Sequence, residues 1–402
     1  MPTLEDIKAA LGRIREQVHL TPCSRSETLS RLTGTSAYLK LENLQKTGAY
    51  KERGALNKLL ILGAAERARG LIAASAGNHA QGVAYHAGRL GVAATIVMPE
   101  TTPILKVANT RALGAKVVLH GASYDEAYAE ARRLEQQDGL TFVHPFDDEA
   151  VIAGQGTIGL ELLEQVPNLD AVLVPVGGGG LVSGVAIALK SVRPQVKVIG
   201  VEAEIIPAMG AAMEAGKPVT VENASTIADG IAVRRVGDLT FGHVKKWVDE
   251  LVTVSEEEIA SAILYLLEKE KTVAEGAGAV SVAALMHRKV HLEGKTVVAI
   301  VSGGNIDVNV VARIIERGLV KDGRLVRIGV ALMDKPGQLA KVSSIISNLK
   351  ANVIEVHHTR AFAYRFGDTT LQLTLETRGP DHVDEILDAL RERGYQVQKL
   401  GI

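Results

Sequence analysis

The sequence predicts an α/β fold with two doubly wound domains, followed by a smaller ferredoxin-like βαββαβ domain. Three observations indicate this class. Apolar, β-rich runs alternate with helical patterns through most of the chain, which is typical of parallel βαβ units. A run of four glycines, 177–180, separates a strand pattern from a helical pattern. Beyond residue 325 the order of the expected elements changes to β-α-β-β-α-β, the ferredoxin-like arrangement.

Two series of alternating elements predict the two doubly wound domains. The first series contains strands at 71–75, 93–98, 116–119 and 141–144, separated by helices at 79–90, 103–113 and 124–137. The second contains strands at 171–176, 196–202 and 296–301, with helices after the glycines and at 256–268 and 275–287. Ligands of open α/β sheets bind at the carboxyl ends of such strands. We therefore expect a ligand cleft between the two domains.

The chain is expected to divide near residue 320. Residues 1–320 would form the larger part, with a small subdomain of about 45–150 inserted in it. The stretch 316–327 is polar and rich in turn residues, which places a linker at 321–325. Residues 326–402 would form the last domain, with strands at 326–333, 353–361, 369–377 and 395–399 and helices at 338–349 and 380–393.

Composition excludes several classes of protein. Lys and Arg number 45 against 46 Asp and Glu, so no overall field would recruit nucleic acid or an anionic membrane. The single cysteine, Cys23, excludes an intramolecular disulfide and a cysteine-rich metal site. Residues 1–20 carry mixed charges and no apolar signal segment, which favours a cytoplasmic location. The uncharged stretch 171–189 is long enough for a membrane span, but Pro175 and the glycines at its centre argue against one.

The glycine run is a candidate phosphate site. A buried strand that enters a glycine loop and then a helix presents several backbone N–H groups at the positive end of that helix. Such N–H groups bind phosphate without any side chain. A tight connection between strand and helix, with no ligand, is the alternative interpretation.

Lys51 and two polar loops are the other candidate functional features. Lys51 follows Tyr50 and precedes a helical stretch, and a lysine in a perturbed environment can act as nucleophile and proton carrier. Any lysine can also be a solvated surface cation. The loop 74–82 and the segment 299–305 each place small polar residues after a strand. They could bind an anion or merely cap a helix.

In this order, the lysine, the anion loop, the tetraglycine loop and a terminal Ser-Gly-Gly-Asn resemble the serine/threonine dehydratase family. Its members are pyridoxal-phosphate (PLP) enzymes of the tryptophan-synthase β-like fold, also called fold type II. The resemblance covers about the first 320 residues and includes the stretches 152–157, 226–230 and 275–279. The remaining segment resembles an ACT domain, a small amino-acid-sensing module.

The resemblance implies a cofactor site for pyridoxal 5'-phosphate. Lys51 would bind the cofactor covalently, and Tyr50, where the family usually has Phe, would pack against its ring. Asn78 would contact the cofactor's 3-oxygen, and the Ser302 hydroxyl would face the ring nitrogen. The phosphate would be bound by the backbone of Gly177, Gly178, Gly179, Gly180 and Leu181.

The resemblance also implies the reaction. Lys51 would remove the Cα proton of a β-hydroxy amino acid, whose hydroxyl then leaves as water. The products would be ammonia and a 2-oxo acid, 2-oxobutanoate from L-threonine or pyruvate from L-serine. Gly230 would lie near the amino group, and the carboxylate would be surrounded by Ser75, Gly77, Asn78, His79 and Gln81.

Two other functions are possible interpretations, and the sequence differs from the family's usual motifs at several positions. The substrate could be L-serine or 3-hydroxyaspartate, for which Arg234 and Arg235 are candidate cations, or the protein could be a non-catalytic amino-acid sensor. The motif Ala-Tyr-Lys at 49–51 replaces the family's common Ser-Phe-Lys. Relatives that racemise serine carry a second serine where this chain has Ala76, so we expect elimination without racemisation.

The resemblance leaves metal binding and regulation as expectations. Many relatives bind a divalent cation, but here only Glu202 matches a ligand and the segment 204–208 lacks the expected Asp, so no metal is placed. ACT modules pair side by side, which predicts a homodimer or homotetramer. An amino-acid effector would bind a loop before a helix, for which a simple turn with a helix-starting proline is the alternative. The candidate effector-binding residues are Asp334, Gly337, Gln338, Leu339 and Asn352.

Overall fold

The structure is a computed structural model that describes residues 2–359 and 368–400. The chain divides into two compact units, unit 1 (Met1–Asp307) and unit 2 (Val308–Ile402). In the described part of the chain, no helix has the length and apolar character needed to cross a bilayer.

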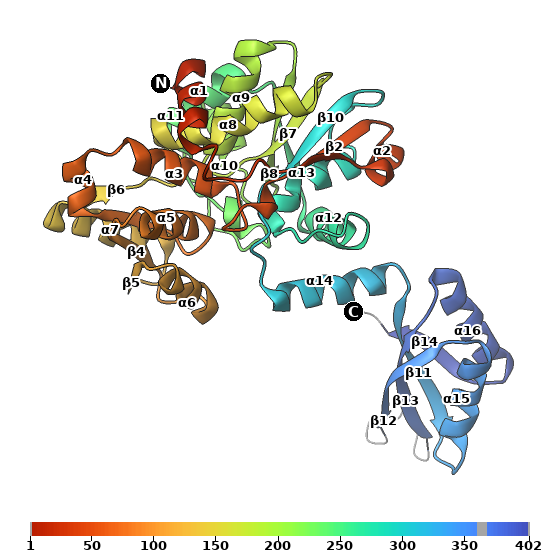
Figure 1. Ribbon diagram of the computed structural model, residues 1–402. Coiled ribbons are helices and arrows are strands. Elements are labelled where there is room, and N and C mark those ends of the chain that lie inside the picture. Colours follow the sequence, from red (N-terminus) through yellow and green to blue (C-terminus); the bar gives the residue numbers. More distant parts are fainter. Residues whose placement is uncertain (1, 360–367, 401–402) are drawn as a thin grey trace. The chain divides into compact units, whose positions relative to one another are not determined.

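Unit 1 is built around a six-stranded sheet (Figure 1). Its central strands are parallel, and only the edge strand β1 runs antiparallel to its neighbour β2. β7 is buried along its whole length, as expected for a parallel strand covered by helices on both faces. In spatial order the strands are β1 (Cys23–Arg25), β2 (Ser36–Leu41), β10 (Thr296–Val301), β7 (Ala171–Pro175), β8 (Lys197–Ala203) and β9 (Glu250–Val254).

A second, four-stranded parallel sheet is formed by the chain between β2 and β7. Its strands, in spatial order, are β5 (Lys116–Leu119), β4 (Ala94–Met98), β3 (Leu71–Ala74) and β6 (Thr141–Phe142). The helices that precede or connect these four strands are α4 (Ala64–Arg69), α5 (Asn78–Arg89), α6 (Ile104–Ala112) and α7 (Tyr124–Asp138).

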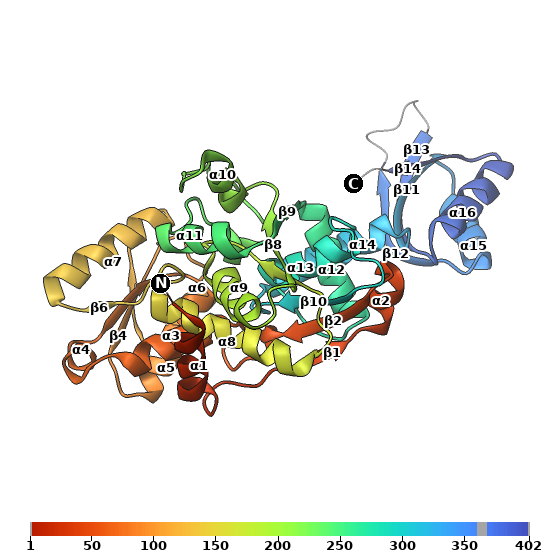
Figure 2. The same cartoon turned by 90° about the horizontal axis from the view of Figure 1, so that it is seen from above.

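Close helix contacts hold unit 1 together. α8 (Glu149–Gln165) packs on both α3 (Lys51–Ile61) and α9 (Gly180–Val192), and Figure 2 shows α8 beside α9. A Cβ atom on Gly154 would lie 2.6 Å from the Cα atom of Gly54, so the backbones of α3 and α8 touch. The other elements are α1 (Leu4–Ile14), α2 (Glu27–Thr33), η1 (Glu42–Leu44), α10 (Ala208–Ala215), η2 (Asp229–Ile231), α11 (Asp238–Trp247), α12 (Glu256–Glu268) and α13 (Gly276–Met286).

The alternating elements expected from the sequence are present in unit 1, with ends that shift by one or two residues. The expectation did not include β1, β2 or β9. β2 contains Lys40, a charged residue that is fully buried, which interrupts the apolar pattern by which strands are recognised.

Unit 2 begins with α14 (Val308–Lys321) and continues as a βαββαβ sequence with an antiparallel sheet in the order β12-β13-β11-β14. Its core lies between this sheet and two helices, with residues such as Ile328, Leu373, Ile346 and Leu390 fully buried. The elements after α14 are β11 (Leu325–Met333), α15 (Gln338–Asn348), β12 (Asn352–Thr359), β13 (Asp368–Glu376), α16 (Pro380–Glu392) and β14 (Gln396–Leu400).

The linker predicted at 321–325 corresponds to a short turn, 322–324, between α14 and β11, and the rest of the polar stretch 316–327 lies within these two elements. The apolar residues Val311, Ile314, Ile315 and Leu319 recur at helical spacing and are buried or half-buried, which explains why the helix continues through the polar residues between them. The compact unit therefore begins at Val308 instead of residue 326. The end of the expected strand 353–361 lies outside the described residues.

Candidate active site

A cavity of about 670 Å³ opens at the carboxyl ends of strands from both sheets of unit 1. The strands β3 and β7 end at Ala74 and Pro175, which line it, and Ser302, which also lines it, directly follows β10. It is lined by most of the cofactor-binding and substrate-binding residues predicted from the sequence: Tyr50, Lys51, Ser75, Gly77, Asn78, His79, Gln81, Gly230 and Ser302.

Lys51 is the first residue of α3, and its side chain reaches into this cavity. Its Nζ donates a hydrogen bond to the carbonyl oxygen of Pro145 at 2.9 Å. Burial lowers the pKa of Lys51 to about 8, although the nearby charge of Glu275 acts in the opposite direction. The amine is thus partly unprotonated near neutral pH, as a nucleophile or base requires.

Asn78 is fixed by a polar network on the wall of the cavity. Its Nδ2 donates to Glu275 Oε1 at 2.6 Å, and its Oδ1 accepts a bond from Asn305 Nδ2 at 2.8 Å. Asn305 also donates to the carbonyl oxygen of Thr47 at 2.7 Å. With both ends of its amide bonded, Asn78 can adopt one orientation only in this network.

Glu275 is a site residue that the sequence analysis did not assign. It precedes α13 and makes no capping hydrogen bond from its side chain, and it lines the cavity. Burial raises the pKa of Glu275 to about 7, so its carboxyl group is partly protonated near neutral pH. The one feature of the sequence that could have identified Glu275 as a site residue is its position before the uncharged stretch 276–286. A carboxylate at that position equally predicts a helix cap.

The polar loops are not helix caps. The N-cap of α5 is Gly77, which makes no side-chain bond, and Ser75 Oγ accepts a bond from the Gly77 N–H at 3.2 Å. Ser302 is almost fully buried and its hydroxyl lies 3.4 Å from the carbonyl oxygen of Ala277. His79 bonds through Nε2 to the Val143 carbonyl at 2.8 Å. Burial lowers the pKa of His79 to about 3, so its ring is neutral and Nε2 is the donor.

The tetraglycine loop joins β7 to α9; it has N–H groups without acceptors in the described part of the chain, and it is tightly packed. Gly178, Gly179 and Gly180 are buried, and their N–H groups have no acceptor among the described residues. A Cβ atom on Gly178 would lie 2.3 Å from the ring of Phe146, so the connection is also tight. The four glycines and Leu181 do not line the cavity themselves; Phe146, which does, packs against Gly178 and Gly180. Buried donors without partners are rare, and here they indicate an anion ligand.

The candidate metal ligand and the candidate cations have partners in the protein. Glu202 is almost fully buried beside α10. Its carboxylate oxygens accept hydrogen bonds from the N–H groups of Met209 (2.7 Å) and Gly210 (2.8 Å). The described residues contain no group of three or more potential metal ligands. Arg234 pairs with Asp125 at 2.7 Å and Arg235 with Asp238 at 2.9 Å.

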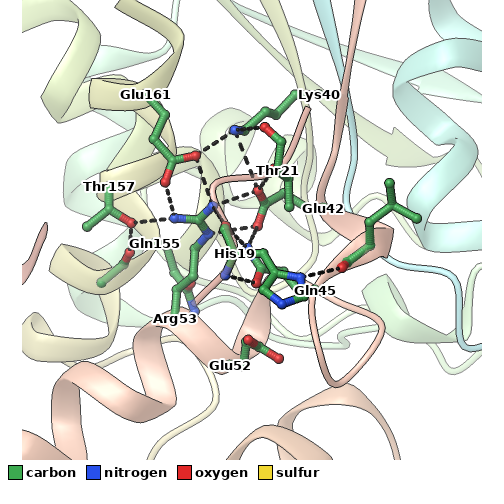
Figure 3. A network of polar contacts seen from close by, with 12 residues as sticks. His19, Thr21, Lys40, Glu42, Gln45, Glu52, Arg53, Gln155, Thr157 and Glu161 are labelled. Carbon is green, nitrogen blue, oxygen red and sulfur yellow. Dashed lines mark hydrogen bonds and ion pairs between the residues drawn. The ribbon is translucent and has the colours of Figure 1, made fainter. Parts of the chain in front are cut away.

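A buried ionic network is centred on Arg53, which follows Lys51 by two positions in the sequence (Figure 3). The Arg53 guanidinium bonds through two nitrogens to Glu42, at 2.7 and 2.8 Å, and through two to Glu161, at 2.5 and 2.9 Å. Lys40 Nζ donates to Glu161 at 2.5 Å and to the Thr21 carbonyl at 2.9 Å. Arg53 and Lys40 are fully buried. The network joins α3 to β2, η1 and α8, and it fixes the helix that begins at Lys51.

The candidate effector residues lie in unit 2. Gly337 is the N-cap of α15, with a φ of 87° and no side-chain cap, so the helix begins at Gln338 and not at Pro336. Asp334 and Leu339 lie on either side of this turn. Asn352 begins β12 and donates to Glu376 Oε2 at 3.3 Å.

Comparisons with known proteins identify the family to which this chain is similar. The family model for "Pyridoxal-phosphate dependent enzyme" matches residues 14–303. The L-threonine ammonia-lyase of Thermotoga maritima is 54% identical over 402 residues, which are 100% of both chains. Threonine deaminase isoform 2 from Solanum lycopersicum has a TM-score of 0.75 at 39% identity, covering 79% of this chain and 90% of its own. Maize serine racemase also has a TM-score of 0.75, at 34% identity, covering 80% and 98%.

The residues present fit pyridoxal phosphate. This cofactor needs an amine for covalent attachment and donors for its phosphate. Lys51 would supply the amine, and the N–H groups of Gly178–Leu181, which have no acceptor among the described residues, would supply the donors. With the family match over most of the sequence, the chain belongs to the family of pyridoxal-phosphate-dependent enzymes.

Proposed function

We propose that the protein is a threonine ammonia-lyase, which converts L-threonine to 2-oxobutanoate and ammonia and also accepts L-serine, giving pyruvate. The observation that carries the proposal is the Lys51 amine, held in the cavity at 2.9 Å from the Pro145 carbonyl with its pKa lowered to about 8 by burial. The relative of 54% identity named L-threonine ammonia-lyase, matched over its full length, supports the choice of substrate.

Positions in the cavity and in the glycine loop beside it support the proposed cofactor contacts. Lys51 attaches the cofactor, Tyr50 packs against its ring and Ser302 faces the ring nitrogen. Asn78, whose amide is oriented by Glu275 and Asn305, contacts the 3-oxygen. The phosphate is bound by the N–H groups of Gly177–Leu181 at the start of α9.

The chain's own residues perform the proposed proton transfers. When bound, pyridoxal 5'-phosphate supplies an electron sink for negative charge at the substrate Cα. The unprotonated Lys51 amine removes the Cα proton. The N-terminus of α5 and the Ser75 hydroxyl bind the substrate carboxylate, together with Gly77, Asn78, His79 and Gln81, and Gly230 lies near the amino group.

Release of 2-oxo acid from a panel of β-hydroxy amino acids tests the proposed substrate. We expect kcat/KM to be highest for L-threonine, followed by L-serine. 3-Hydroxyaspartate should react poorly, because Arg234 and Arg235 are both paired with carboxylates. A preference for 3-hydroxyaspartate would overturn the choice of substrate. Absence of any product with bound cofactor would favour the amino-acid sensor.

Cofactor attachment should depend on pH through the Lys51 amine. The reacting species is the neutral amine, whose fraction increases as pH rises through its pKa of about 8. The rate at which apo-protein regains the absorbance of lysine-bound cofactor should therefore rise with pH, with a midpoint near pH 8, and level off about one unit higher. Stopped-flow absorbance measures this rate. A midpoint near 10.5, the ordinary lysine value, would show that Lys51 is solvated.

Ala76→Ser should introduce racemisation of serine. Ala76 lines the cavity in the loop that precedes α5, and alanine has no proton to transfer. With Lys51 as the only base, Cα is deprotonated and reprotonated from one side. Chiral chromatography should detect D-serine with the variant and only traces with the unmodified enzyme. Rapid D-serine formation by the unmodified enzyme would mean that another group serves the opposite side of Cα.

Unit 2 is proposed to be an ACT domain that binds a regulatory amino acid. Its βαββαβ order supports this, as does the turn at Gly337, where the N–H groups that begin α15 have no side-chain cap. Asp334, Gln338, Leu339 and Asn352 are the proposed effector contacts. We also propose a cytoplasmic homodimer or homotetramer, which light scattering of the purified protein would test.

Removal of unit 2 should abolish regulation and keep catalysis. A chain that ends at Asp307 contains the whole cavity, so its rate with saturating threonine should stay within about twofold of the full chain. Any response of the full chain to branched-chain or related amino acids should be lost. Asp334→Ala in the full chain should weaken the same response. An unchanged response in the shortened chain would place the effector site in unit 1.

A further inference from the structure

Thr240 lies behind the tetraglycine loop and bonds to its backbone. It is fully buried in the first turn of α11. Its hydroxyl donates to the carbonyl oxygen of Gly178 at 2.6 Å, with the Gly237 carbonyl at 3.2 Å. Its own N–H donates to Asp147 Oδ1 at 3.0 Å, so the residue is held at both its backbone and its side chain.

This bond determines where the next N–H group points. In a planar trans peptide the C=O and N–H groups point in opposite directions. Because the Gly178 carbonyl points to Thr240, the N–H of Gly179 points away from Thr240. That N–H is buried and has no acceptor among the described residues.

The loop has contacts on two sides. A Cβ atom on Gly179 would lie 2.7 Å from Met209 Cε and 2.9 Å from Thr240 Cβ. On the Phe146 side, a Cβ atom on Gly178 would lie 2.3 Å from the ring of that cavity-lining residue. The loop thus lies between Thr240 and Met209 at its back and a residue of the cavity wall.

A peptide between two glycines needs such an anchor. Glycine has no Cβ and adopts positive and negative φ with similar ease, and Gly179 has a φ of +93°. Rotation of the Gly178–Gly179 peptide would therefore meet little resistance from the chain itself. The Thr240 bond opposes it, because a rotated peptide would leave the buried Gly178 carbonyl without its donor.

We propose that Thr240 is a positioning residue for cofactor binding, which fixes the Gly178–Gly179 peptide so that the Gly179 N–H is available to the cofactor phosphate. The inference rests on the proposed phosphate site at this loop. It adds a residue that lies outside the cavity and does not touch the cofactor. Its contribution is preorganisation: the donor is oriented before the ligand arrives.

Two ligands that differ only in the phosphate provide the test. The dissociation constants of apo-protein for pyridoxal 5'-phosphate and for pyridoxal are measured by absorbance titration. Thr240→Val keeps the shape and removes the hydroxyl, and Thr240→Ser keeps the hydroxyl. We expect Thr240→Val to weaken pyridoxal phosphate binding by about tenfold and to leave pyridoxal binding unchanged. Thr240→Ser should stay within about twofold of the unmodified protein for both ligands.

Thr110→Val is the matched control. Thr110 is equally buried, and its hydroxyl bonds to the Lys106 carbonyl within α6, away from the loop. The control should preserve the ratio of the two dissociation constants. If Thr240→Val does not fold, Thr240→Ala carries the same expectation, with thermal unfolding of the apo-protein as the check of folding.

The outcomes separate this inference from the proposed site. An equal loss of affinity for both ligands in Thr240→Val, or no loss, would overturn the role of Thr240. If the unmodified protein binds pyridoxal as tightly as pyridoxal phosphate, the phosphate site at the glycine loop is itself wrong. A loss confined to pyridoxal phosphate and restored by serine would support the inference.

Discussion

Lys51→Ala is expected to lower the rate of threonine deamination by at least about a thousandfold. One amine both attaches the cofactor and carries the Cα proton, so its loss removes two functions together. The visible absorbance of lysine-bound cofactor should disappear as well. The fold should persist, because the Lys51 side chain makes one hydrogen bond, to the Pro145 carbonyl.

Lys46→Ala provides the control for this experiment. Lys46 lies five residues earlier, is exposed and donates to the Gln17 carbonyl at 3.3 Å. Its replacement should leave both the rate and the absorbance unchanged. Circular dichroism and thermal unfolding would establish that both variants are folded. Substantial deamination by Lys51→Ala would mean that another group removes the Cα proton.

Arg53→Met is expected to reduce the free energy of unfolding by about 3–5 kcal/mol. The substitution removes the guanidinium that both Glu42 and Glu161 contact in Figure 3 and leaves two buried carboxylates with one cation, Lys40. Burial favours the neutral form of Glu42, yet the charge and hydrogen bonds of Arg53 lower its pKa overall. Urea denaturation measures the loss.

Two further variants distinguish the cost of an unpaired buried charge from the cost of losing an ion pair. Lys58→Met, on the same helix, breaks a 2.6 Å pair with Asp148 that is partly exposed and should cost about 1 kcal/mol. Adding Glu161→Gln to Arg53→Met restores a net charge of zero to the cluster. The double variant should therefore be more stable than Arg53→Met alone. Equal losses in Arg53→Met and Lys58→Met would show that burial of these charges has no special cost.

The features that the sequence predicts well are those determined by neighbouring residues. The strand β7, the glycine turn and the helix α9 form one uncharged stretch, and a strand, a glycine loop and a helix occur there in the expected order. The α/β fold and the dependence on pyridoxal phosphate are confirmed by the family match. The alternation of strand and helix patterns predicts the fold, and the resemblance carried by Lys51, the two polar loops and the tetraglycine loop predicts the cofactor.

The features that the sequence does not reveal depend on distant partners. β2 contains Lys40, and its full burial is possible only because Glu161, on α8, neutralises it. The pKa of Glu275 is likewise raised by its burial in the folded site and by the charge of Asp229, while the hydrogen bond from Asn78, from the other sheet's segment of chain, acts in the opposite direction. Local pattern contains neither partner, so neither result could be derived from it.

The position of β10 in the chain has a consequence for synthesis on the ribosome. β2 emerges early, but β10, its parallel partner, is the last strand of unit 1. At about 5–20 residues per second, the delay between them is on the order of ten to fifty seconds. During this time β2 presents an unpaired edge on which other nascent chains can assemble. The four strands of the smaller sheet all emerge within that interval. A chaperone that covers β2 during this interval should therefore raise the yield of native protein.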